Sequence, residues 1–252
     1  MIEVLILSII QGITEFLPVS SSSHLIIVSK YLNFENQSLS LDVSLHIGSF
    51  IAVVTYFRKD IFSFVKNKDL FIKIIISSIP VMIVGFLLVK YNLIEKLRNI
   101  EIIGWTTIIF GILLYVSDKY SLDKKIETDF NFKSAIFIGI LQILSLIPGV
   151  SRSGITISAA RILKFNRVDS AKISFLLSIP TLIAVSFFGL KNLITYENVD
   201  ISNLNLISIF FSFLFSYITI KFFLDYIKNF NLNLFVIYRI ILGLVLLTIA
   251  YL

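Results

Sequence analysis

Long apolar runs alternate with short polar segments along the whole chain. Six of these runs are long enough for membrane-spanning helices, since each approaches the roughly 20 residues that cross a hydrocarbon core of about 30 Å. They cover residues 41–57, 70–89, 100–117, 172–191, 205–224 and 234–252. The pattern therefore predicts an all-α polytopic membrane protein with about six crossings.

Two further apolar regions are interrupted in the middle. Residues 2–34 break at Pro18, which is soon followed by serines at positions 20–23, and residues 134–165 break at Pro148 and Gly149. After each break the second piece runs for only about 12 to 15 residues before charged loops begin, which is too short to cross. Each region therefore predicts a re-entrant helix pair that enters and leaves on the same side of the membrane.

The two interrupted regions resemble each other. A shift of 131 residues places positions 19–22 (VSSS) on 150–153 (VSRS), and a shift of 132 places 51–53 on 183–185 (both IAV). We interpret this as an internal duplication within a single membrane domain of residues 1–252, with repeats at about 1–118 and 132–252. Each repeat holds one re-entrant pair and three crossings, so about ten helical pieces are expected in all. Because three is odd, the two repeats must have inverted topologies.

The composition agrees with a protein embedded in lipid. Hydrophobic residues make up 57% of the 252 residues and charged residues 15%, and the mean hydropathy is +0.93. A soluble fold of this length lacks the polar surface to cover so many apolar side chains. The chain has no cysteine and only two histidines. This excludes disulfides, thiolate nucleophiles and a metal site built from three histidines.

The net charge of +6 predicts an orientation in the membrane, and we expect no nucleic acid partner. When the N-terminus is placed on one side, the opposite side receives 15 lysines and arginines and the first side receives five. Cytoplasmic loops are enriched in these residues, so both termini are predicted to be extracytoplasmic. The predicted cytoplasmic loops are 58–73, 117–133, 161–172 and 221–228. The sequence indicates no oligomeric state.

Three ionisable residues lie beside the two breaks: Glu15, His24 and Arg152. A charge at membrane depth is costly, so it normally faces a partner or a wet cavity. Each second half-helix also begins with unpaired N–H groups and the positive end of its dipole, which together bind anions. If the two breaks meet near the midplane, two such helix starts converge with the guanidinium of Arg152, whose planar fork suits a phosphate.

Hydroxyl groups surround the same breaks. They belong to Ser20, Ser21, Ser22, Ser23, Ser151, Ser153 and Thr156. Serine, histidine, glutamate and arginine together fit phosphoryl transfer, with a nucleophile, an acid–base group, a metal or orienting ligand, and a charge clamp. Glu15 would hold a bridging cation or a catalytic proton, and His24 is the group expected to titrate near neutral pH. The apolar half of the substrate would come from the lipid itself.

A structural role is the alternative for each of these residues. Serines near a proline often act only as helix caps, Arg152 can pair with Glu15 without any ligand, and a membrane histidine often only satisfies a hydrogen bond. Their joint placement at both breaks favours a site. His46, with Asp42 one turn earlier, is more typical of helix packing. Arg239 lies in an apolar run and is expected to pair internally, with a partner that the sequence does not reveal.

Two other function classes compete with phosphoryl transfer. A secondary transporter or lipid flippase also uses inverted repeats and broken helices that meet at the midplane, and it is the alternative function. The combination of nucleophile and histidine favours an enzyme over a transporter. A lipid phosphatase of the phosphatidic-acid type would need a histidine downstream of Ser151-Arg152, and the chain has none there.

Two long motifs resemble one family of enzymes. Residues 11–25 (QGITEFLPVSSSSHL) and 148–156 (PGVSRSGIT) are similar to the two signatures of the bacterial undecaprenyl-diphosphate phosphatase, or bacitracin-resistance, family, and residues 42–48, 175–180 and 235–239 extend the resemblance. The resemblance implies an inner-membrane enzyme that removes the terminal phosphate of undecaprenyl diphosphate, recycles the carrier lipid for cell-wall synthesis and gives bacitracin resistance. It also implies an active site that opens outward and a dependence on Mg²⁺ or Ca²⁺.

The same resemblance assigns roles to individual residues. The catalytic residues that it implies are Glu15, Ser21, His24 and Arg152. The supporting, substrate-binding residues are Ser20, Ser22, Ser151, Ser153, Gly154 and Thr156. The divalent cation would be held by Glu15 together with Gln11. In one scheme Ser21 attacks the terminal phosphorus with His24 as acid and base, and in the other His24 itself is the nucleophile.

Two positions depart from the family pattern. Many members carry glutamate where this chain has Gln11, one helical turn before Glu15, and an uncharged amide oxygen binds a cation more weakly. The family usually has glycine where this chain has Ser23. If that position requires a positive φ, the serine incurs strain of about 1 kcal/mol or more.

Overall fold

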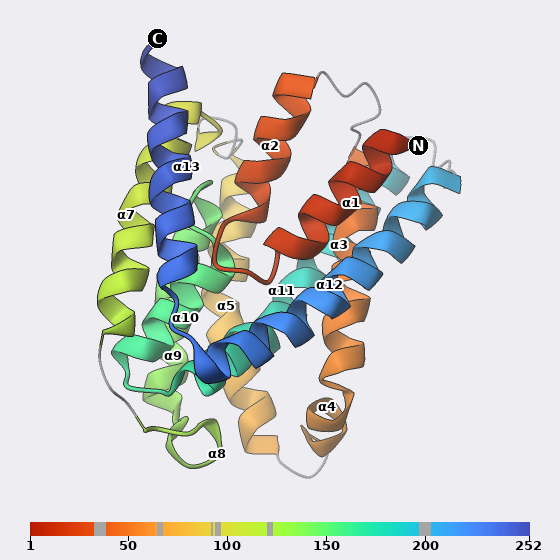
Figure 1. Ribbon diagram of the computed structural model, residues 1–252. Coiled ribbons are helices and arrows are strands. Elements are labelled where there is room, and N and C mark those ends of the chain that lie inside the picture. Colours follow the sequence, from red (N-terminus) through yellow and green to blue (C-terminus); the bar gives the residue numbers. More distant parts are fainter. Residues whose placement is uncertain (33–38, 65–67, 92, 94–96, 120–122, 197–202) are drawn as a thin grey trace.

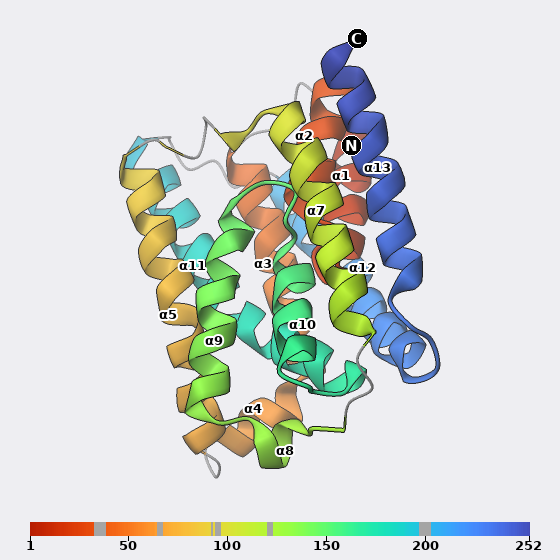
Figure 2. The ribbon, with the colours of Figure 1, turned by 90° about the vertical axis from the view of Figure 1, so that its left-hand side faces the viewer.

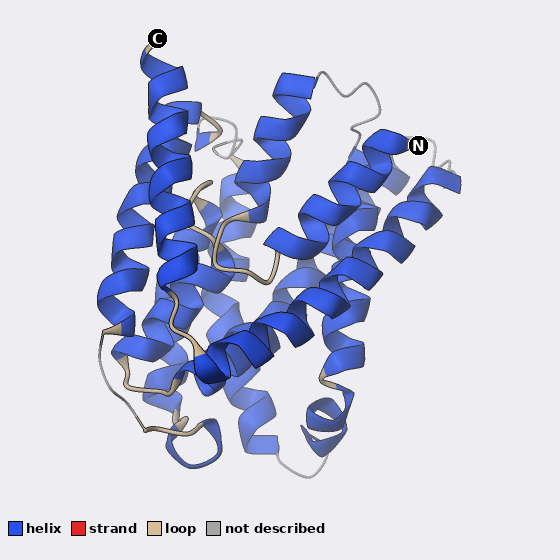
Figure 3. Cartoon of the chain, in the orientation of Figure 1, coloured by secondary structure: helices blue, strands red, loops and turns tan. Residues whose placement is uncertain are grey.

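The computed structural model describes residues 1–32, 39–64, 68–91, 93, 97–119, 123–196 and 203–252 (Figure 1). This part of the chain is almost entirely helical and contains no β-strand, although one isolated bridge joins Lys124 and Phe165 (Figure 3). The all-α fold class is therefore confirmed.

Helices of very different lengths follow one another along the chain. In order they are α1 (Ile2–Thr14), α2 (Ser21–Leu32), α3 (Leu39–Tyr56), α4 (Arg58–Phe64), α5 (Lys68–Lys90), α7 (Ile100–Asp118), α8 (Ile126–Asp129), α9 (Phe132–Gln142), the 3-10 helix η1 (Ile143–Leu146), α10 (Arg152–Ile162), α11 (Arg167–Tyr196), α12 (Asn203–Asn229) and α13 (Asn233–Tyr251). Among the described residues, five helices are long and apolar enough to cross a membrane: α5, α7, α11, α12 and α13. The protein is a multi-pass membrane protein, and five of the six predicted spans are confirmed.

The sixth predicted span, 41–57, corresponds to α3, a helix of 18 residues. At 1.5 Å per residue it is about 27 Å long, slightly less than the hydrocarbon core. Its apolar part, Ser40–Tyr56, stands among the shorter apolar helices of the described chain. In Figure 1, α3 nevertheless runs from the end of the molecule that holds the N-terminus to the end that holds α4.

Each interrupted region folds as two half-helices that turn back in the interior. α1 and α2 form a V that opens toward the end with both chain termini (Figure 1). α9, η1 and α10 form a second V that opens toward the opposite end, near α8 (Figure 2). The two shapes match the predicted re-entrant pairs and their opposite senses. As a result, α2 and α10 both begin in the interior of the molecule.

The turns inside the two V shapes share an unusual backbone feature. Ser20 has a φ of 76° and Ser151 a φ of 68°, and each lies one residue before a half-helix. Residues with side chains rarely adopt this left-handed conformation, which costs about 1–3 kcal/mol. The two serines are 131 residues apart, the shift that aligns the repeats. This recurrence supports the duplication, whose boundaries stay a prediction.

Small residues bring the long helices close together. A Cβ atom added to Gly48 of α3 would lie 2.5 Å from the carbonyl oxygen of Ile209 in α12. Nearby, the Ser49 hydroxyl is 3.2 Å from that of Ser212 and 3.0 Å from that of Ser216. Apolar side chains gain little by leaving lipid for protein, so close backbone approach and hydrogen bonds hold such helices together. The two interior turns are thus surrounded by closely packed helices.

The loops that the charge count assigns to one side gather at one end of the molecule. α4, α8 and the turn between α12 and α13 lie toward the end opposite both termini (Figures 1 and 2). At that end the buried Asp118 of α7 pairs with Arg161 at 3.1 Å and with Arg167 at 2.8 Å, which ties α7 to α10 and α11. Lys66 and Lys96, which enter the charge count, lie outside the described residues.

Candidate active site

Two interior turns form the floor of the candidate site. We call residues 16–20, between α1 and α2, the first turn, and residues 147–151, between η1 and α10, the second turn. Each contains a proline, which lacks an N–H group and cannot continue the preceding helix. Each ends in a left-handed serine, after which a new helix begins. The first N–H groups of α2 and α10 therefore lie in the interior, where an anion can use them.

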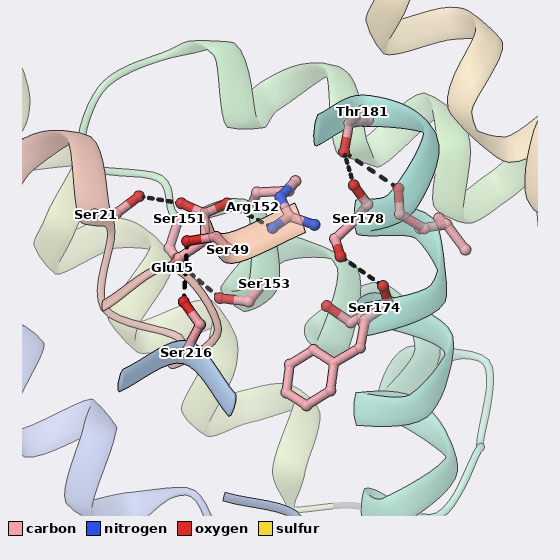
Figure 4. A network of polar contacts seen from close by, with 12 residues as sticks. Glu15, Ser21, Ser49, Ser151, Arg152, Ser153, Ser174, Ser178, Thr181 and Ser216 are labelled. Atoms are coloured by element: carbon pink, nitrogen blue, oxygen red, sulfur yellow. Dashed lines mark hydrogen bonds and ion pairs between the residues drawn. The ribbon is translucent and has the colours of Figure 1, made fainter. Parts of the chain in front are cut away.

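Three of the four predicted catalytic residues meet where the two turns approach each other (Figure 4). Glu15 Oε1 accepts a 2.7 Å hydrogen bond from Arg152 Nη2, and its Oε2 accepts one of 2.7 Å from the Ser21 hydroxyl. The side chains of Glu15 and Arg152 are only 8% and 15% exposed. The pairing of Arg152 with Glu15, which was the structural alternative for this arginine, is therefore present. One carboxylate thus binds a guanidinium and a serine hydroxyl, and a base within hydrogen-bond distance of a hydroxyl is what the activation of a serine requires.

Ser151 and Ser153 organise the second turn. The Ser151 hydroxyl accepts a 3.1 Å hydrogen bond from the Gly154 N–H and so caps α10, which is the structural role expected of a serine near a proline. Ser153 donates a 2.7 Å hydrogen bond to the carbonyl oxygen of Leu17 in the first turn. The Ser151 and Ser153 hydroxyl oxygens are 3.2 Å apart. These contacts join the two turns directly.

Thr156 connects α10 to α11. Its hydroxyl donates to the carbonyl oxygen of Arg152 at 2.8 Å and lies 2.7 Å from the Ser174 hydroxyl. Figure 4 shows Ser174, Ser178 and Thr181 in a row along α11, beside the Arg152 side chain. The residues 175–180, which carry part of the family resemblance, thus belong to a helix that borders the site.

His46 lies nearer to the site than a role in helix packing alone implies. Its Nδ1 is 2.7 Å from the carbonyl oxygen of Asp42, one turn earlier in α3. The imidazole also interacts electrostatically with the Glu15 carboxylate. α3 therefore contributes a titratable group to the surroundings of the ion pair.

Ser20 of the first turn forms hydrogen bonds with serines at the start of α2. The Ser20 hydroxyl oxygen is 2.9 Å from that of Ser23 and 3.5 Å from that of Ser22, which is exposed. Ser23 lies inside α2 and has no positive φ. The condition for strain at Ser23 is therefore not met, and replacing the family's glycine has no such cost. The left-handed position is Ser20 instead, which sequence reasoning did not identify.

His24 lies on α2, one turn beyond the left-handed serine. Its Nδ1 is 2.6 Å from the Ser20 carbonyl oxygen, and its Nε2 bonds with the hydroxyl of Tyr238 in α13. The two rings are stacked with centroids 5.7 Å apart. A carbonyl oxygen only accepts hydrogen bonds, so Nδ1 carries the proton and Nε2 accepts from the tyrosine. The hydrogen-bond partner of Ser21 is Glu15, whereas His24 bonds to Ser20 and Tyr238.

Arg239 is fully buried in α13 and reaches both turns. Nη1 donates to the carbonyl oxygens of Pro18 and Val150, both at 3.1 Å, and Nη2 donates to that of Gly149 at 2.9 Å. Nε donates to the carbonyl oxygen of Thr107 in α7 at 3.2 Å. The internal pairing expected of this arginine is therefore made with backbone carbonyls, which leave no signature in a sequence.

Comparison of the sequence with known proteins identifies the family of this chain. The family model of the bacitracin resistance protein BacA matches residues 4–245. The chain belongs to this family. A curated relative named undecaprenyl-diphosphatase, from Pelagibacter ubique (strain HTCC1062), is 54% identical over 251 residues, which cover 99% of this chain and 98% of the relative. Relatives of the same name from Jannaschia sp. (strain CCS1) and Ruegeria sp. (strain TM1040) are 38% and 36% identical, over 98% and 100% of this chain and 97% and 99% of their own lengths.

The donor set of this BacA-family chain fits a divalent cation that also binds phosphate oxygens. Gln11 Nε2 donates to Glu15 Oε2 at 3.2 Å, while Gln11 Oε1 is buried without a hydrogen-bond partner. An unpaired amide oxygen beside a carboxylate is a ligand pair suited to Mg²⁺ or Ca²⁺. Within the described ranges, no group of three or more histidine, aspartate and glutamate residues could hold a metal. The remaining ligands would therefore have to be substrate oxygens and water.

Two residues of this BacA-family chain were not placed at the site by sequence reasoning. Tyr238 contacts His24 across 214 residues of sequence, and Arg239 contacts both turns. A signal for them existed, because residues 235–239 carry part of the family resemblance and Arg239 is a charge within an apolar run. What the sequence could not reveal was which groups they contact.

Proposed function

We propose that this protein hydrolyses undecaprenyl diphosphate to undecaprenyl phosphate and inorganic phosphate, which recycles the carrier lipid for cell-wall synthesis and confers resistance to bacitracin. The observation that carries the proposal is the cluster of Arg152, Glu15 and Ser21 between two half-helix starts inside a membrane protein. Three relatives named undecaprenyl-diphosphatase, each aligned over nearly the full chain, support the same activity.

The protein resides in the bacterial plasma membrane, with both termini extracytoplasmic and the active site open to the outside. The excess of lysine and arginine in the loops at the opposite end supports this orientation. The V of α1 and α2 opens toward the end that holds the termini (Figure 1). A lipid diphosphate in the outer leaflet would enter there and leave its prenyl chain between helices.

The diphosphate takes the place of Glu15 at the Arg152 guanidinium. A guanidinium binds a phosphate through two parallel N–H groups, and the starts of α2 and α10 add backbone donors. The hydroxyls of Ser20 in the first turn and of Ser22 at the start of α2 supply further donors. Glu15 and Gln11 would hold Mg²⁺ or Ca²⁺, which neutralises part of the substrate's charge when bound.

In the first chemical step Ser21 attacks the terminal phosphorus. A bond forms between Ser21 Oγ and that phosphorus, the bond from phosphorus to the bridging oxygen breaks, and undecaprenyl phosphate leaves. The proton of the Ser21 hydroxyl passes to Glu15, whose Oε2 accepts its hydrogen bond at 2.7 Å. Arg152 stabilises the negative charge on the transferring group.

In the second step water attacks the phosphoserine. The water gives a proton to Nε2 of His24 once the Tyr238 hydroxyl has released that nitrogen, the bond between Ser21 Oγ and phosphorus breaks, and Glu15 returns its proton to the serine. The imidazolium then gives its extra proton to solvent. This assignment of His24 rests on its hydrogen bonds to Ser20 and Tyr238, since the partner of Ser21 is Glu15. The competing scheme, in which His24 is the nucleophile, predicts a phosphohistidine instead.

Phosphate release from purified protein tests the function. Protein in detergent, given a polyprenyl diphosphate and Mg²⁺, should release phosphate without any ion gradient, whereas a transporter or flippase would not. Absence of release would overturn the proposal. Glu15→Ala and Arg152→Ala should each lower kcat/KM by about 10³-fold. Asp225→Ala is the matched control, because Asp225 is an exposed acidic residue paired with Lys228 on α12.

The variants also test whether this cluster is the active site, and whether Ser21 or His24 is the nucleophile. Undiminished release by both Glu15→Ala and Arg152→Ala would exclude this site while leaving the activity intact. Ser21→Ala should retain no covalent intermediate if the serine is the nucleophile. A phosphorylated His24 trapped in that variant would exclude the serine scheme.

A further inference from the structure

Arg239 is the largest fully buried side chain in the described part of the chain. Its hydrogen bonds all go to backbone carbonyl oxygens, and none of the ion pairs among the described residues includes it. Burying a charge is expensive unless hydrogen bonds compensate for the lost water. Arg239 lies beside the candidate site but is bonded to none of Glu15, Ser21, His24 and Arg152. Its role is therefore to be sought in the two turns whose carbonyl oxygens it binds.

The carbonyl groups that Arg239 binds come from both turns. The Pro18 oxygen belongs to the first turn and the Gly149 and Val150 oxygens to the second, so one guanidinium spans the junction. A carbonyl oxygen left near the diphosphate would repel it. In a trans peptide the C=O and the next N–H point in opposite directions. Holding the Val150 oxygen on one side of the turn therefore aims the Ser151 N–H to the other side.

The surrounding helices are shaped to admit this guanidinium. A Cβ atom added to Gly154 of α10 would lie 3.0 Å from Arg239 Nη1, and one added to Gly111 of α7 would lie 3.1 Å from Arg239 Cβ. Both distances are tighter than ordinary van der Waals contact. The arginine is thus closely fitted between α7 and α10, which restricts it to one position relative to the turns.

We propose that Arg239 is a positioning residue for phosphoryl transfer, which fixes the two interior turns relative to each other and thereby the nucleophile Ser21 relative to the clamp Arg152. Its catalytic consequence rests on the proposed phosphatase function, whereas its effect on the geometry of the turns does not. Two measurements separate these parts.

The first measurement is steady-state turnover. Arg239→Lys keeps a positive charge, but its ammonium has only three N–H donors on one nitrogen, so it cannot make the four hydrogen bonds that the guanidinium makes to Thr107 and to the two turns. A misplacement of about 1 Å costs about 10²-fold in rate, and we expect kcat to fall by about that factor in Arg239→Lys and at least as far in Arg239→Gln. KM should change by less than about 3-fold, because Arg239 does not contact the substrate.

The second measurement is the distance between the two re-entrant pairs, obtained by pulsed electron paramagnetic resonance. The chain has no cysteine, so spin labels can be attached at Ile13→Cys on α1 and Ile140→Cys on α9, both exposed positions. Arg239→Lys and Arg239→Gln should broaden the distance distribution of the ligand-free protein. This result does not depend on turnover, so it tests the positioning role even if the phosphatase proposal fails.

Arg161→Lys is the matched control. Arg161 is also a buried guanidinium bonded to backbone carbonyls, those of Phe165 and Asp118, and it lies near the opposite end of α10. It pairs in addition with the Asp118 carboxylate at 3.1 Å, and lysine keeps a positive charge for that partner. Its replacement should leave the distance distribution and kcat unchanged within about 2-fold. Equal broadening in this control would mean general loosening and would overturn the proposal. A loss of kcat in Arg239→Lys with an unchanged distance distribution would overturn it as well.

A milder variant keeps the test valid if the arginine variants do not fold. Gly111→Ala retains Arg239 and pushes on its Cβ from α7. We expect several-fold lower kcat with a shifted distance distribution. Wild-type turnover and distances in Gly111→Ala would contradict the tight fit on which the proposal depends.

Discussion

The two re-entrant pairs have the same backbone break but very different surroundings. α10 is buried from Ser153 to Arg161 and packs against α7, α9 and α11. α2 packs chiefly against α1, and Ser21, Ser22 and His24 near its start are partly or fully exposed. One pair is therefore fixed within the bundle, and the other borders the space that a substrate must enter.

The two pairs also differ in the chemical groups at equivalent positions. At the shift of 131 residues, Glu15 corresponds to Leu146, Ser21 to Arg152, and His24 to Ile155. In the proposed mechanism the groups that exchange protons, Glu15, Ser21 and His24, all belong to the first pair, whose second helix is the more exposed of the two. The fixed charge belongs to the buried pair, where it is worth more because water is excluded. The two turns thus correspond in the repeat alignment and differ in the side chains that surround them.

Gln142 is the counterpart of Gln11 in the second pair. It corresponds to Gln11 in the repeat alignment and is fully buried, and neither atom of its amide group has a hydrogen-bond partner. Gln11 donates to Glu15 one turn later, whereas the residue one turn after Gln142 is Leu146. The second pair thus has the amide without the carboxylate that is its partner in the first pair.

The strongest test of the difference between the two re-entrant pairs is to substitute the equivalent positions Glu15 and Leu146. Glu15→Gln removes the base of Ser21 and the partner of Arg152, and kcat/KM for phosphate release should fall by about 10³-fold. Leu146→Ala should change it by less than about 3-fold, although it lowers stability. A comparable loss of rate in both variants would show that the division of roles is wrong.

A second test concerns the contact of α2 with α13. Tyr238→Phe removes the hydroxyl that bonds with His24 Nε2. One hydrogen bond contributes about 1 kcal/mol, so we expect kcat to fall by about 5- to 10-fold. Tyr251→Phe is the control on the same helix, because its hydroxyl bonds with Trp105 and Glu101 instead. Full activity of Tyr238→Phe would remove this tyrosine from the site.

The first arms of both pairs should respond alike to added volume. A Cβ atom at Gly12 would lie 2.9 Å from the Ser216 nitrogen in α12, and one at Gly139 would lie 2.4 Å from the Ser77 carbonyl oxygen in α5. Alanine at either position should lower the free energy of unfolding by about 1–3 kcal/mol, measured by thermal denaturation in detergent. Gly85→Ala is the control, since its Cβ would meet only a side chain, at 3.4 Å.

The smallest expected effect is that of restoring the family's glycine in Ser23→Gly. Ser23 lies within α2, so glycine removes a helix-favouring constraint and the contact with Ser20. The protein should lose about 1 kcal/mol of stability, and its phosphate release should stay within about 2-fold. A gain in melting temperature would instead mean that Ser23 is strained after all.

Sequence reasoning succeeded wherever the relevant physics is local. Hydrophobic length located the spanning helices, and the prolines located the breaks. The pairing of Glu15 with Arg152 was among the alternatives, because opposite charges at membrane depth seek each other. The left-handed backbone at Ser20 was not predictable, since glycine rather than serine signals that conformation. The contacts of Tyr238 and Arg239 depend on how distant helices pack, and backbone carbonyls have no residue type.

Because Glu15 is bound to Arg152, the Glu15 carboxylate competes with any anion for the Arg152 guanidinium. In the proposed mechanism, an incoming diphosphate has to displace the Glu15 carboxylate, which is attached to the same chain and bound to the guanidinium. The affinity for every anion is reduced accordingly, and this includes the inorganic phosphate that forms. When that product loosens, Glu15 can return to Arg152 and prevent rebinding. The same contact that weakens capture of the substrate thus hastens the departure of the product.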